Sequence, residues 1–347
     1  MFNSVFGRFS KDIAVDLGTS NTRVFVRERG IVMHEPSIVA VNTRTNHILA
    51  VGTAAKDMLG KTPPHIVTTR PLTKGVISDF EVTEKMLKYF VDKVHEETFT
   101  LVPRPRMIMS VPLETTEVER KAVEDAALSA GAREAFLVEA PLCAAIGAGL
   151  PVEESIGSMI VDIGGGTTEI AVIALGGIVT WKSLTVAGDE MTKSIVQYAR
   201  DVFNLLVGER VAEEVKWRIG STMDMGTPVE MEMRGRYLIT GLPRQVMVND
   251  TQIREAIYRN VQHIVENIKA TIEVTPPEIV ADIYERGIVL TGGGALLRGI
   301  DRTIARETDI PVRIADDPLT CTVRGAGALL DHEALLKDIS LPTTAHN

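Results

Sequence analysis

The feature that most constrains the fold of this chain is an internal repeat. The stretches DIAVDLGTSNTRVFV (residues 12–26) and SMIVDIGGGTTEIAV (residues 158–172) align without gaps, so that Asp16 matches Asp162 and Gly18 matches Gly164. Each copy has an apolar strand, a tight turn rich in Gly and Thr, and a second apolar strand, which together predict a β-hairpin. The chain is therefore predicted to fold as two similar α/β halves.

Both turns carry groups suited to an anion. Their glycines let backbone N–H groups approach a phosphate closely, and the Thr and Ser hydroxyls add further donors. The aspartate that opens each turn cannot bind phosphate directly, but it can hold Mg²⁺ through water. A third stretch, GIVLTGGGALLRG at residues 287–299, predicts a buried strand, a triple-glycine turn and a helix start, which suits a nucleotide. The alternative is three tight turns without a ligand, and the matched aspartates favour the nucleotide.

Between the turns, apolar residues recur at helical spacing. We expect helices at residues 119–131, 191–206, 209–219 and 251–274, with Asp250 as the N-cap of the last one. The alternating stretch VEMEMR, which begins at Val229, predicts a half-buried strand, and residues 237–248 are expected to form its partner.

Composition narrows the function further. The 347 residues include 37 Lys and Arg against 46 Asp and Glu, a net charge of −9, which argues against a general nucleic-acid binder. Only Cys143 and Cys321 are present, too few for a disulfide framework and consistent with a reducing compartment. No apolar run approaches the roughly 20 residues needed to cross a bilayer. We expect a cytoplasmic protein without nucleic-acid partners.

The N-terminal segment could nevertheless contact lipid. Phe2, Val5, Phe6 and Phe9 share one face if MFNSVFGRFSKD is helical, the pattern of an interfacial anchor. Each buried apolar side chain contributes about 1.5–3 kcal/mol, so one copy would bind weakly, whereas many copies on one assembly would bind strongly through avidity. The alternative is a terminal segment that packs on the protein body.

Together these motifs resemble the MreB family of bacterial actin homologues, within the actin, chaperone and sugar-kinase ATPase superfamily. The resemblance runs from the Phe-rich start to about Asp338. It is carried in order by DLGTSNT, GIVMHEPSIVAV, GVISDFEVTEKMLKYF, AIGAGLP, VDIGGGTTE and GIVLTGGGALLRG. It implies an actin-like α/β fold with two duplicated lobes, each a mixed sheet flanked by helices, and with ATP and Mg²⁺ in the central cleft.

The same resemblance implies four subdomains. Subdomain IA would take residues 1–32, 75–154 and 318–347, and subdomain IB residues 33–74. Subdomain IIA would take residues 155–190 and 247–317, and subdomain IIB residues 191–246.

The resemblance also implies roles for individual residues. Glu213 and Lys216, three apart on one helix, match the pair that contacts ribose and adenine in relatives, although the residues alone favour a solvated helix face. Asp16 and Asp162 would lie near the metal, and Asp162 and Thr167 would belong to the hydrolytic site. The phosphate and adenosine loops would comprise Gly18, Thr19, Ser20 and Asn21, then Gly164, Gly165, Gly166, Thr167 and Thr168, and finally Gly292, Gly293, Gly294 and Ala295.

Members of the MreB family contact lipid through an N-terminal amphipathic helix or an apolar loop. This chain has candidates for both, because Phe99, Leu101 and Val102 lie in a loop that Pro103 and Arg104 follow. The alternative for that loop is a partly buried connection. The resemblance implies homopolymeric filaments at the inner face of the cytoplasmic membrane. It also implies MreC- and RodZ-like membrane proteins of the cell-wall elongation machinery as partners.

One position departs from the family pattern. The residue that orients the attacking water in these ATPases is a glutamate directly before a proline, but VEAPLCAAIGAGL has Ala140 before Pro141. A methyl group can neither orient nor deprotonate water, and losing such a group typically costs about 10²–10⁴-fold in rate. The change could be natural loss of hydrolysis, an introduced trap for the ATP state, or a shift of the role to Glu139. The shift is the weakest option because successive side chains of an extended segment point to opposite sides.

Three functions compete on this basis. The leading one is a cytoskeletal filament protein that binds ATP, hydrolyses it slowly and organises cell-wall synthesis for rod shape. The second is a sugar or acid kinase built on the same ATPase core, for which no further motif is found. The third is a chaperone ATPase, which would normally carry a long C-terminal substrate domain, whereas this chain ends in a helix and the tail SLPTTAHN.

Overall fold

The computed structural model describes residues 11–96 and 104–342. The candidate lipid-binding residues Phe2, Val5, Phe6, Phe9, Phe99, Leu101 and Val102 lie outside this range. The chain divides into two compact units: unit 1 comprises residues 1–156, 173–179 and 319–347, and unit 2 comprises residues 157–172 and 180–318. Each unit contains one of the two repeated turns, in agreement with the duplication read from the sequence. The division into four subdomains stays a prediction.

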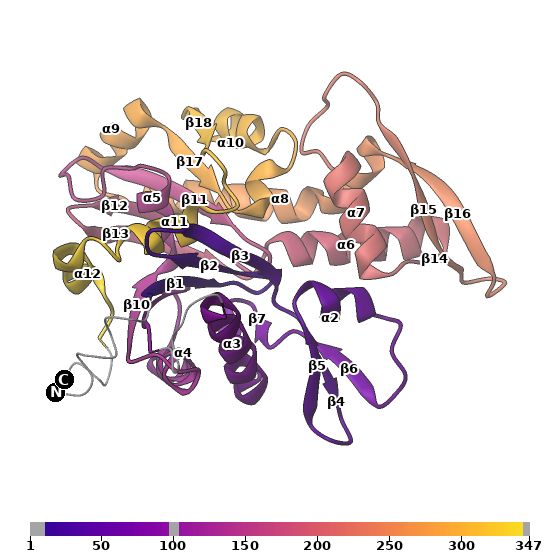
Figure 1. The fold of residues 1–347 in the computed structure, drawn as a ribbon. Helices are drawn as coiled ribbons and strands as arrows, with labels where there is room; N and C mark the ends of the chain where they lie inside the picture. The colour runs from indigo at the N-terminus through magenta and orange to yellow at the C-terminus, as the bar shows by residue number, and fades with distance from the viewer. Residues whose placement is uncertain (1–10, 97–103, 343–347) are drawn as a thin grey trace. The chain divides into compact units, whose positions relative to one another are not determined.

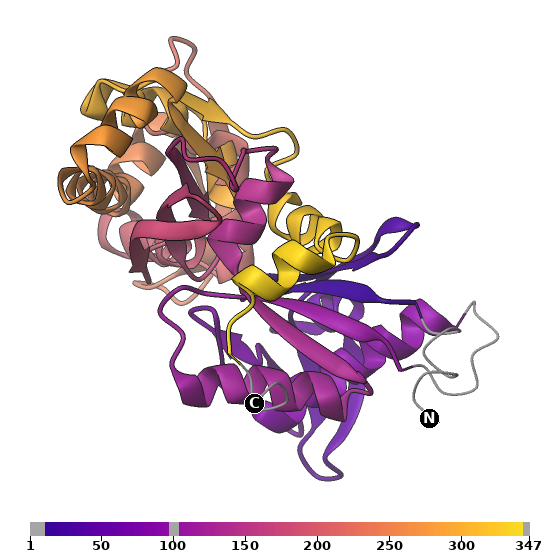
Figure 2. The same ribbon diagram turned by 90° about the vertical axis from the view of Figure 1, so that its left-hand side faces the viewer.

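The main sheet of unit 1 has five strands in the order β10-β9-β1-β2-β3. Strands β1, β9 and β10 are parallel, whereas β1, β2 and β3 form an antiparallel meander. Helices α3 and α4 lie on one face of this sheet, and α5 and α11 lie on the other (Figures 1 and 2). The elements are β1 (Ile13–Leu17), β2 (Asn21–Val26), β3 (Gly30–Pro36), β9 (Arg106–Val111), β10 (Glu134–Glu139), α3 (Phe80–His95), α4 (Glu117–Ser129), α5 (Ala140–Gly147) and α11 (Cys321–Ala328).

Alternation along the strands of unit 1 separates the two faces of the sheet. Ile13, Val15 and Leu17 of β1 pack in one core with Leu87 of α3 and Ala126 of α4. Ala14 and Asp16 therefore lie on the opposite face, toward α5 and α11, because strand side chains alternate. Helix α4 begins two residues earlier than expected, since Thr116 and Glu119 form a capping box at its start.

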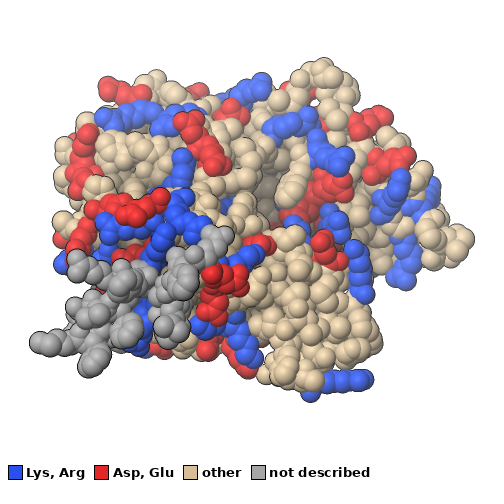
Figure 3. All heavy atoms as spheres, in the orientation of Figure 1, with Lys and Arg blue, Asp and Glu red and all other residues tan. Residues whose placement is uncertain are grey.

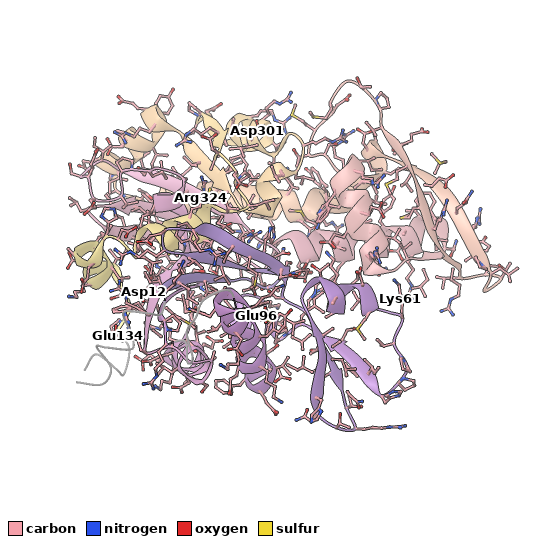
Figure 4. The ribbon with its side chains drawn as sticks, in the orientation of Figure 1. Asp12, Lys61, Glu96, Glu134, Asp301 and Arg324 are labelled. Carbon is pink, nitrogen blue, oxygen red and sulfur yellow. The ribbon has the colours of Figure 1, made fainter. Side chains whose placement is uncertain are left out.

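The parallel strands of unit 1 are joined at their starting edge by Asp12. Its Oδ1 accepts hydrogen bonds from the backbone N–H of Arg106 (3.0 Å) and from the guanidinium of Arg133 (3.1 Å). Figure 4 shows Asp12 at the same edge as Glu134, the first residue of β10. This cluster holds the starts of β1, β9 and β10 together, and so also fixes the register of their carboxyl ends.

Unit 1 also contains two smaller sheets and two further helices. The first sheet has the order β5-β4-β6, and β7 pairs with β8 in the second. The elements are β4 (Val39–Asn42), β5 (His47–Val51), β6 (Ile66–Thr69), β7 (Leu72–Thr73), β8 (Val76–Ile77), α2 (Thr53–Met58) and α12 (Glu333–Ile339).

Glu35 of β3 anchors α2 and gives a testable pH dependence. Its carboxylate accepts from the Thr53 backbone N–H (2.9 Å), the Thr53 hydroxyl (2.7 Å) and the Lys93 ammonium (3.3 Å). Burial alone would raise the pKa of Glu35, but these donors hold the pKa below its usual value of 4.5. A lowered pKa in the folded state adds stability above the unfolded-state pKa, and this stability is lost as the pH falls through the folded value.

We therefore expect Glu35→Gln to lower the thermal-unfolding midpoint at pH 7 and to lower it less at pH 4, because pH 4 lies below the usual pKa of 4.5. The measurement is a pair of melting curves at each pH for the parent and the variant. Glu134→Gln, at an exposed carboxylate, is the matched control. A deficit of the Glu35 variant that is equally large at pH 4 and pH 7 would contradict the assigned role.

The main sheet of unit 2 also has five strands, in the order β13-β12-β11-β17-β18. Strand β11 is parallel to β17, and β17 is parallel to β18. A three-stranded sheet, β14-β15-β16, lies at one end of this unit (Figure 1). The elements are β11 (Ser158–Ile163), β12 (Thr168–Ala174), β13 (Gly177–Leu184), β17 (Ile288–Thr291), β18 (Val312–Ile314), β14 (Leu205–Leu206), β15 (Glu230–Tyr237), β16 (Pro243–Asn249), α6 (Gly188–Phe203), α7 (Glu209–Ile219), α8 (Asp250–Glu273), α9 (Pro277–Arg286), η1 (Gly293–Leu296) and α10 (Ile300–Thr308).

Three expected elements in unit 2 need correction. Helix α6 stops at Phe203 because Asn204 adopts a left-handed conformation (φ 50°), after which Leu205 and Leu206 pair with β15 as a strand. The expected strand at residues 237–248 is instead the end of β15, a turn, and β16. The N-cap of α8 is Asn249 rather than Asp250, since the Asn249 side chain accepts from the backbone N–H of Gln252.

Candidate nucleotide-binding site

The first repeated turn lies in unit 1, between β1 and β2. The backbone N–H of Gly18 donates to the Asn21 carbonyl (3.2 Å), which leaves Thr19 and Ser20 at the tip of the turn. A Cβ atom on Gly18 would lie 2.8 Å from that same carbonyl oxygen. Position 18 therefore excludes any side chain, and the glycine at the start of the turn is a packing requirement.

Asp16 is oriented at the carboxyl ends of the parallel strands. One carboxylate oxygen accepts from the Arg23 guanidinium (3.1 Å) and the other from the Ser110 hydroxyl (3.1 Å). Ligands of open α/β sheets bind at this edge of the sheet. Each oxygen of Asp16 keeps acceptor capacity beyond these bonds, so the side chain fits the water-mediated Mg²⁺ role expected for it.

The hydroxyls near the turns do not all serve as ligand donors. The Thr22 hydroxyl is fully buried and bonds to the Ser37 hydroxyl (2.9 Å), and the Thr168 hydroxyl donates to the Val186 carbonyl (2.8 Å). The Thr19 hydroxyl accepts from the Gly75 backbone N–H (2.8 Å). Thr22 and Thr168, which match in the repeat, therefore hold the turns in shape, and the expectation that such hydroxyls serve as extra donors is wrong for these two residues.

The second turn, in unit 2, repeats the geometry of the first. The Gly164 N–H donates to the Thr167 carbonyl (2.9 Å) and leaves Gly165 and Gly166 at the tip. The start of α6 rests on this turn, because the N–H groups of Gly188 and Asp189 donate to the carbonyls of Gly164 (3.1 Å) and Gly165 (2.8 Å). Sequence reasoning missed this support. The available signal was the Gly188-Asp189 pair, which lies just before the helix expected from residue 191.

The third turn lies beside the second one within unit 2. Asp162 of β11 is the register partner of Thr291 of β17. Gly292 has φ 79°, and a Cβ atom on it would lie 2.3 Å from Asp162 Oδ1. A Cβ on Gly294 would lie 2.2 Å from Ile163 Cγ2. The structure thus brings together Asp162, at the start of the second turn, and the Gly292–Gly294 turn, while the following Ala295 is fully buried.

Helix α7 connects to the second turn through Lys216. The Lys216 ammonium donates to the Gly188 carbonyl (2.7 Å) and the Thr192 hydroxyl (2.8 Å), and Gly188 itself bonds to Gly164. Glu213 and Lys216 are partly buried, whereas Glu214, Trp217 and Arg218 on the same helix are exposed. The residues alone favoured a solvated helix face for Lys216. The structure instead shows Lys216 partly buried and bonded to Gly188 and Thr192.

Ala140 is the first residue of α5 and directly follows β10. Asp16, Ser110 and Val138 are register partners on one face of the sheet. Glu139 pairs with Val111, which packs in the core with α3 and α4, and so lies on the opposite face from Asp16. Burial raises the pKa of Glu139, and the positive charge of Arg120 on α4 partly offsets this rise. The strand register therefore places Glu139 on the opposite face of the sheet from Asp16.

Comparison with known proteins decides the family. The family model described as MreB/Mbl protein matches residues 10–338. The chain belongs to the MreB/Mbl family. Cell shape-determining protein MreB of Escherichia coli K12 is 48% identical, with 95% of this chain and 96% of that protein covered. Cell shape-determining protein Mbl of Bacillus subtilis is 45% identical, with 93% of this chain and 97% of that protein covered.

A solved structure extends the comparison to three dimensions. The crystal structure of MreB5 of Spiroplasma citri bound to ADP superimposes with a TM-score of 0.89 at 35% identity, and covers 95% of this chain and 98% of that one. MreB5 bound to AMPPNP matches equally well. The fold of this MreB/Mbl family member is actin-like, as the sequence predicted.

Proposed function

We propose that this family member is an ATP-binding, actin-like cytoskeletal protein that forms membrane-associated filaments and organises cell-wall synthesis for rod cell shape. The observation that carries the proposal is the match over nearly the whole chain to proteins named as cell shape-determining. The nucleotide-bound MreB5 structures support ADP and ATP as the ligands. No observation favours the sugar or acid kinase.

In this proposal each of the three turns contacts a different part of the bound ATP and Mg²⁺. Backbone N–H groups at residues 18–21 and 164–167 contact the phosphates, and the Gly292–Gly294 turn accommodates the adenosine. Asp16 and Asp162 hold Mg²⁺ through water, as Mg²⁺ usually keeps several waters and takes one or two carboxylates together with phosphate. Bound Mg²⁺ neutralises charge on the phosphate oxygens.

The nucleotide acts on assembly through a population shift. ATP that binds the assembling conformation more tightly than the other one increases the population of the assembling form. Because Ala140 cannot position the attacking water, hydrolysis is slow and the ATP-bound form persists. Membrane association through the two apolar segments at residues 2–9 and 99–102, with MreC- and RodZ-like partners at the inner membrane surface, completes the proposal. None of the helices within residues 11–96 and 104–342 is long and apolar enough to cross a membrane.

Electron microscopy of the purified protein with and without lipid, each with and without ATP and Mg²⁺, tests this function. We expect filaments that require both the nucleotide and the membrane. Dispersed monomers under all four conditions would contradict the filament proposal and would reopen the kinase and chaperone interpretations.

Lys216 provides a residue-level test of the nucleotide site. Lys216→Met removes the ammonium that joins α7 to the start of α6, and hydrogen bonds to a charged group contribute about 1.5–3 kcal/mol. We expect affinity for a fluorescent ATP analogue to fall about tenfold or more. Arg218→Met, two residues later on the exposed side of α7 and paired with Glu214 (2.8 Å), is the control and should leave affinity unchanged. Equal affinities of the two variants for the ATP analogue would show that Lys216 is not part of the nucleotide site.

A further inference from the structure

Helix α7 ends against the segment that follows the third turn, and Arg298 makes the contact. Its guanidinium donates through Nη2 to the Ile219 carbonyl (2.7 Å) and through Nε to the Gly220 carbonyl (3.1 Å). The last carbonyls of a helix lack partners within the helix, and a cation beside them also faces the negative end of the helix dipole. Arg298 therefore caps α7 from a distant part of the chain. We call the contact between residues 219–222 and residues 297–298 the α7 junction.

Backbone contacts reinforce the α7 junction. The Thr222 N–H donates to the Arg298 carbonyl (2.9 Å), and Ser221 pairs with Arg298 in an isolated parallel β-bridge. A Cβ atom on Gly220 would lie 3.1 Å from Leu297 Cδ1, so the two segments pack closely at this point. Both the side chain and the backbone of Arg298 therefore hold the end of α7.

The α7 junction fixes the position of α7 relative to the third turn. That turn ends four residues before Arg298, and the Leu297 N–H donates to the Gly294 carbonyl (3.0 Å). Lys216 makes the other attachment, since it donates to the carbonyl of Gly188, which rests on the second turn. Helix α7 is thus held at two points within unit 2, by Lys216 toward the second turn and by Arg298 toward the third turn.

We propose that Arg298 is a positioning residue for the nucleoside half of the bound nucleotide. It sets the separation between the third turn and α7, which carries Glu213 and Lys216, so that the base and ribose fit between them. Arg298 acts through this separation, because its guanidinium is engaged by two backbone carbonyls. The phosphates are contacted elsewhere, at residues 18–21 and 164–167. The inference rests on the proposed ATP-binding function and adds a residue that lies outside the three turns.

Arg298→Met tests this role, because it removes both guanidinium bonds. Isothermal titration calorimetry in the presence of Mg²⁺ compares ATP with inorganic tripolyphosphate, which has the phosphates but no base or ribose. Bonds to a charged group are stronger than neutral ones. We expect their loss to weaken ATP binding by about tenfold. The affinity for tripolyphosphate should change by less than about twofold, which is within the spread of neutral surface substitutions. A residue that only stabilised the fold would not separate the two ligands.

Two further variants define the chemistry at position 298. Arg298→Lys keeps the charge but replaces the planar fork of donors by a single ammonium, so its affinity for ATP should lie between those of the parent and Arg298→Met. Arg302→Met removes the same charge from an exposed position on α10 and should bind both ligands as the parent does. Figure 3 shows Lys and Arg side chains mixed with Asp and Glu side chains over the visible face of unit 2, so the loss of one exposed charge changes the local field little.

Gly220→Ala disturbs the same junction while Arg298 stays in place. The new Cβ would lie 2.3 Å from the Lys216 carbonyl oxygen as well as close to Leu297, so the end of α7 must shift away from the third turn. We expect the same selective loss of ATP binding. Gly208→Ala, at the start of α7, is the matched control, because its Cβ would meet no atom within 4 Å. Circular dichroism and urea unfolding identify the variants that fold, and the two routes keep the test valid if one variant does not.

The outcomes separate this inference from the function on which it rests. A parent chain that does not bind ATP contradicts the proposed nucleotide function itself. If the parent binds ATP but folded Arg298→Met binds it equally well, or loses ATP and tripolyphosphate to the same extent, the positioning role of Arg298 is wrong. A selective loss in Arg298→Met that is absent from folded Gly220→Ala would also overturn the inference, because the placement of α7 would then not be the cause.

Discussion

Replacing Ala140 by glutamate is expected to raise the rate of phosphate release by about 10²–10⁴-fold. Ala140 is the first residue of α5 and follows β10 at the edge of the sheet where β1 presents Asp16. A carboxylate at this position can orient the attacking water and accept its proton, whereas the methyl group of alanine can do neither. The measurement is single-turnover phosphate release from the ATP- and Mg²⁺-loaded protein.

Two variants make this experiment specific. Ala140→Gln supplies a group that orients water but is a poor base, so its rate should lie between those of the parent and Ala140→Glu. Glu139→Gln should leave the parental rate unchanged, because Glu139 lies on the opposite face of the sheet from Asp16 and near Arg120. A parental rate that collapses in Glu139→Gln, or an Ala140→Glu variant no faster than the parent, would refute the assignment of position 140.

The largest expected loss of stability is at the crossing of α5 and α11 in unit 1. Both helices contain the spacing Cys-x-x-x-Gly, from Cys143 to Gly147 and from Cys321 to Gly325. A Cβ atom on Gly147 would lie 1.9 Å from the Cys321 carbonyl oxygen, and one on Gly325 would lie 1.8 Å from the Cys143 carbonyl oxygen. The two backbones are therefore in direct contact, and only glycine fits on either side.

Gly147→Ala and Gly325→Ala are each expected to destabilise the protein by about 3 kcal/mol, because a methyl group that clashes with backbone cannot be relieved by a rotamer change. Urea unfolding followed by circular dichroism measures the shift. The double variant should lose less than the sum of the two, since one separation of the helices relieves both clashes.

Gly177→Ala is the control for this pair, as its Cβ would meet only the Ala174 carbonyl oxygen, at 3.9 Å. This substitution should change stability by no more than about 0.5 kcal/mol. Unfolding midpoints that agree among Gly147→Ala, Gly325→Ala and Gly177→Ala would show that the crossing tolerates separation.

Elements governed by short-range rules were predictable from the residues. The bounds of α7, residues 209–219, agree with the expectation, because its amphipathic period and the following glycine define them locally. Helix α6 was predicted three residues too long at its end, since Leu205 and Leu206 have ordinary helical propensity and form a strand only because β15 is there to pair with them. The turn between β15 and β16 was missed although Gly241, which has φ 74°, and Pro243 are local turn signals in the sequence.

The candidate site also combines features that were predictable from the sequence with features that were not. The glycines and aspartates of the three turns are visible in the sequence, because tight turns restrict backbone conformation and close approach to few residue types. The contact of Gly292 with Asp162 and the bonds of Lys216 to Gly188 and Thr192 join segments far apart in the chain. No local pattern encodes such partners.

The sequence by itself determined the duplication, the glycine-rich turns, the family and the alanine before Pro141, since each is a property of a short segment or of residue identity. Only the tertiary structure decided that Glu139 and Asp16 lie on opposite faces of the sheet. It also decided that the hydroxyls of Thr22 and Thr168 bond to protein groups beside the turns. The contact of α5 with α11 through Gly147 and Gly325 is likewise a tertiary feature. These features depend on strand register and helix crossing, which arise when distant segments bury their apolar faces against one another.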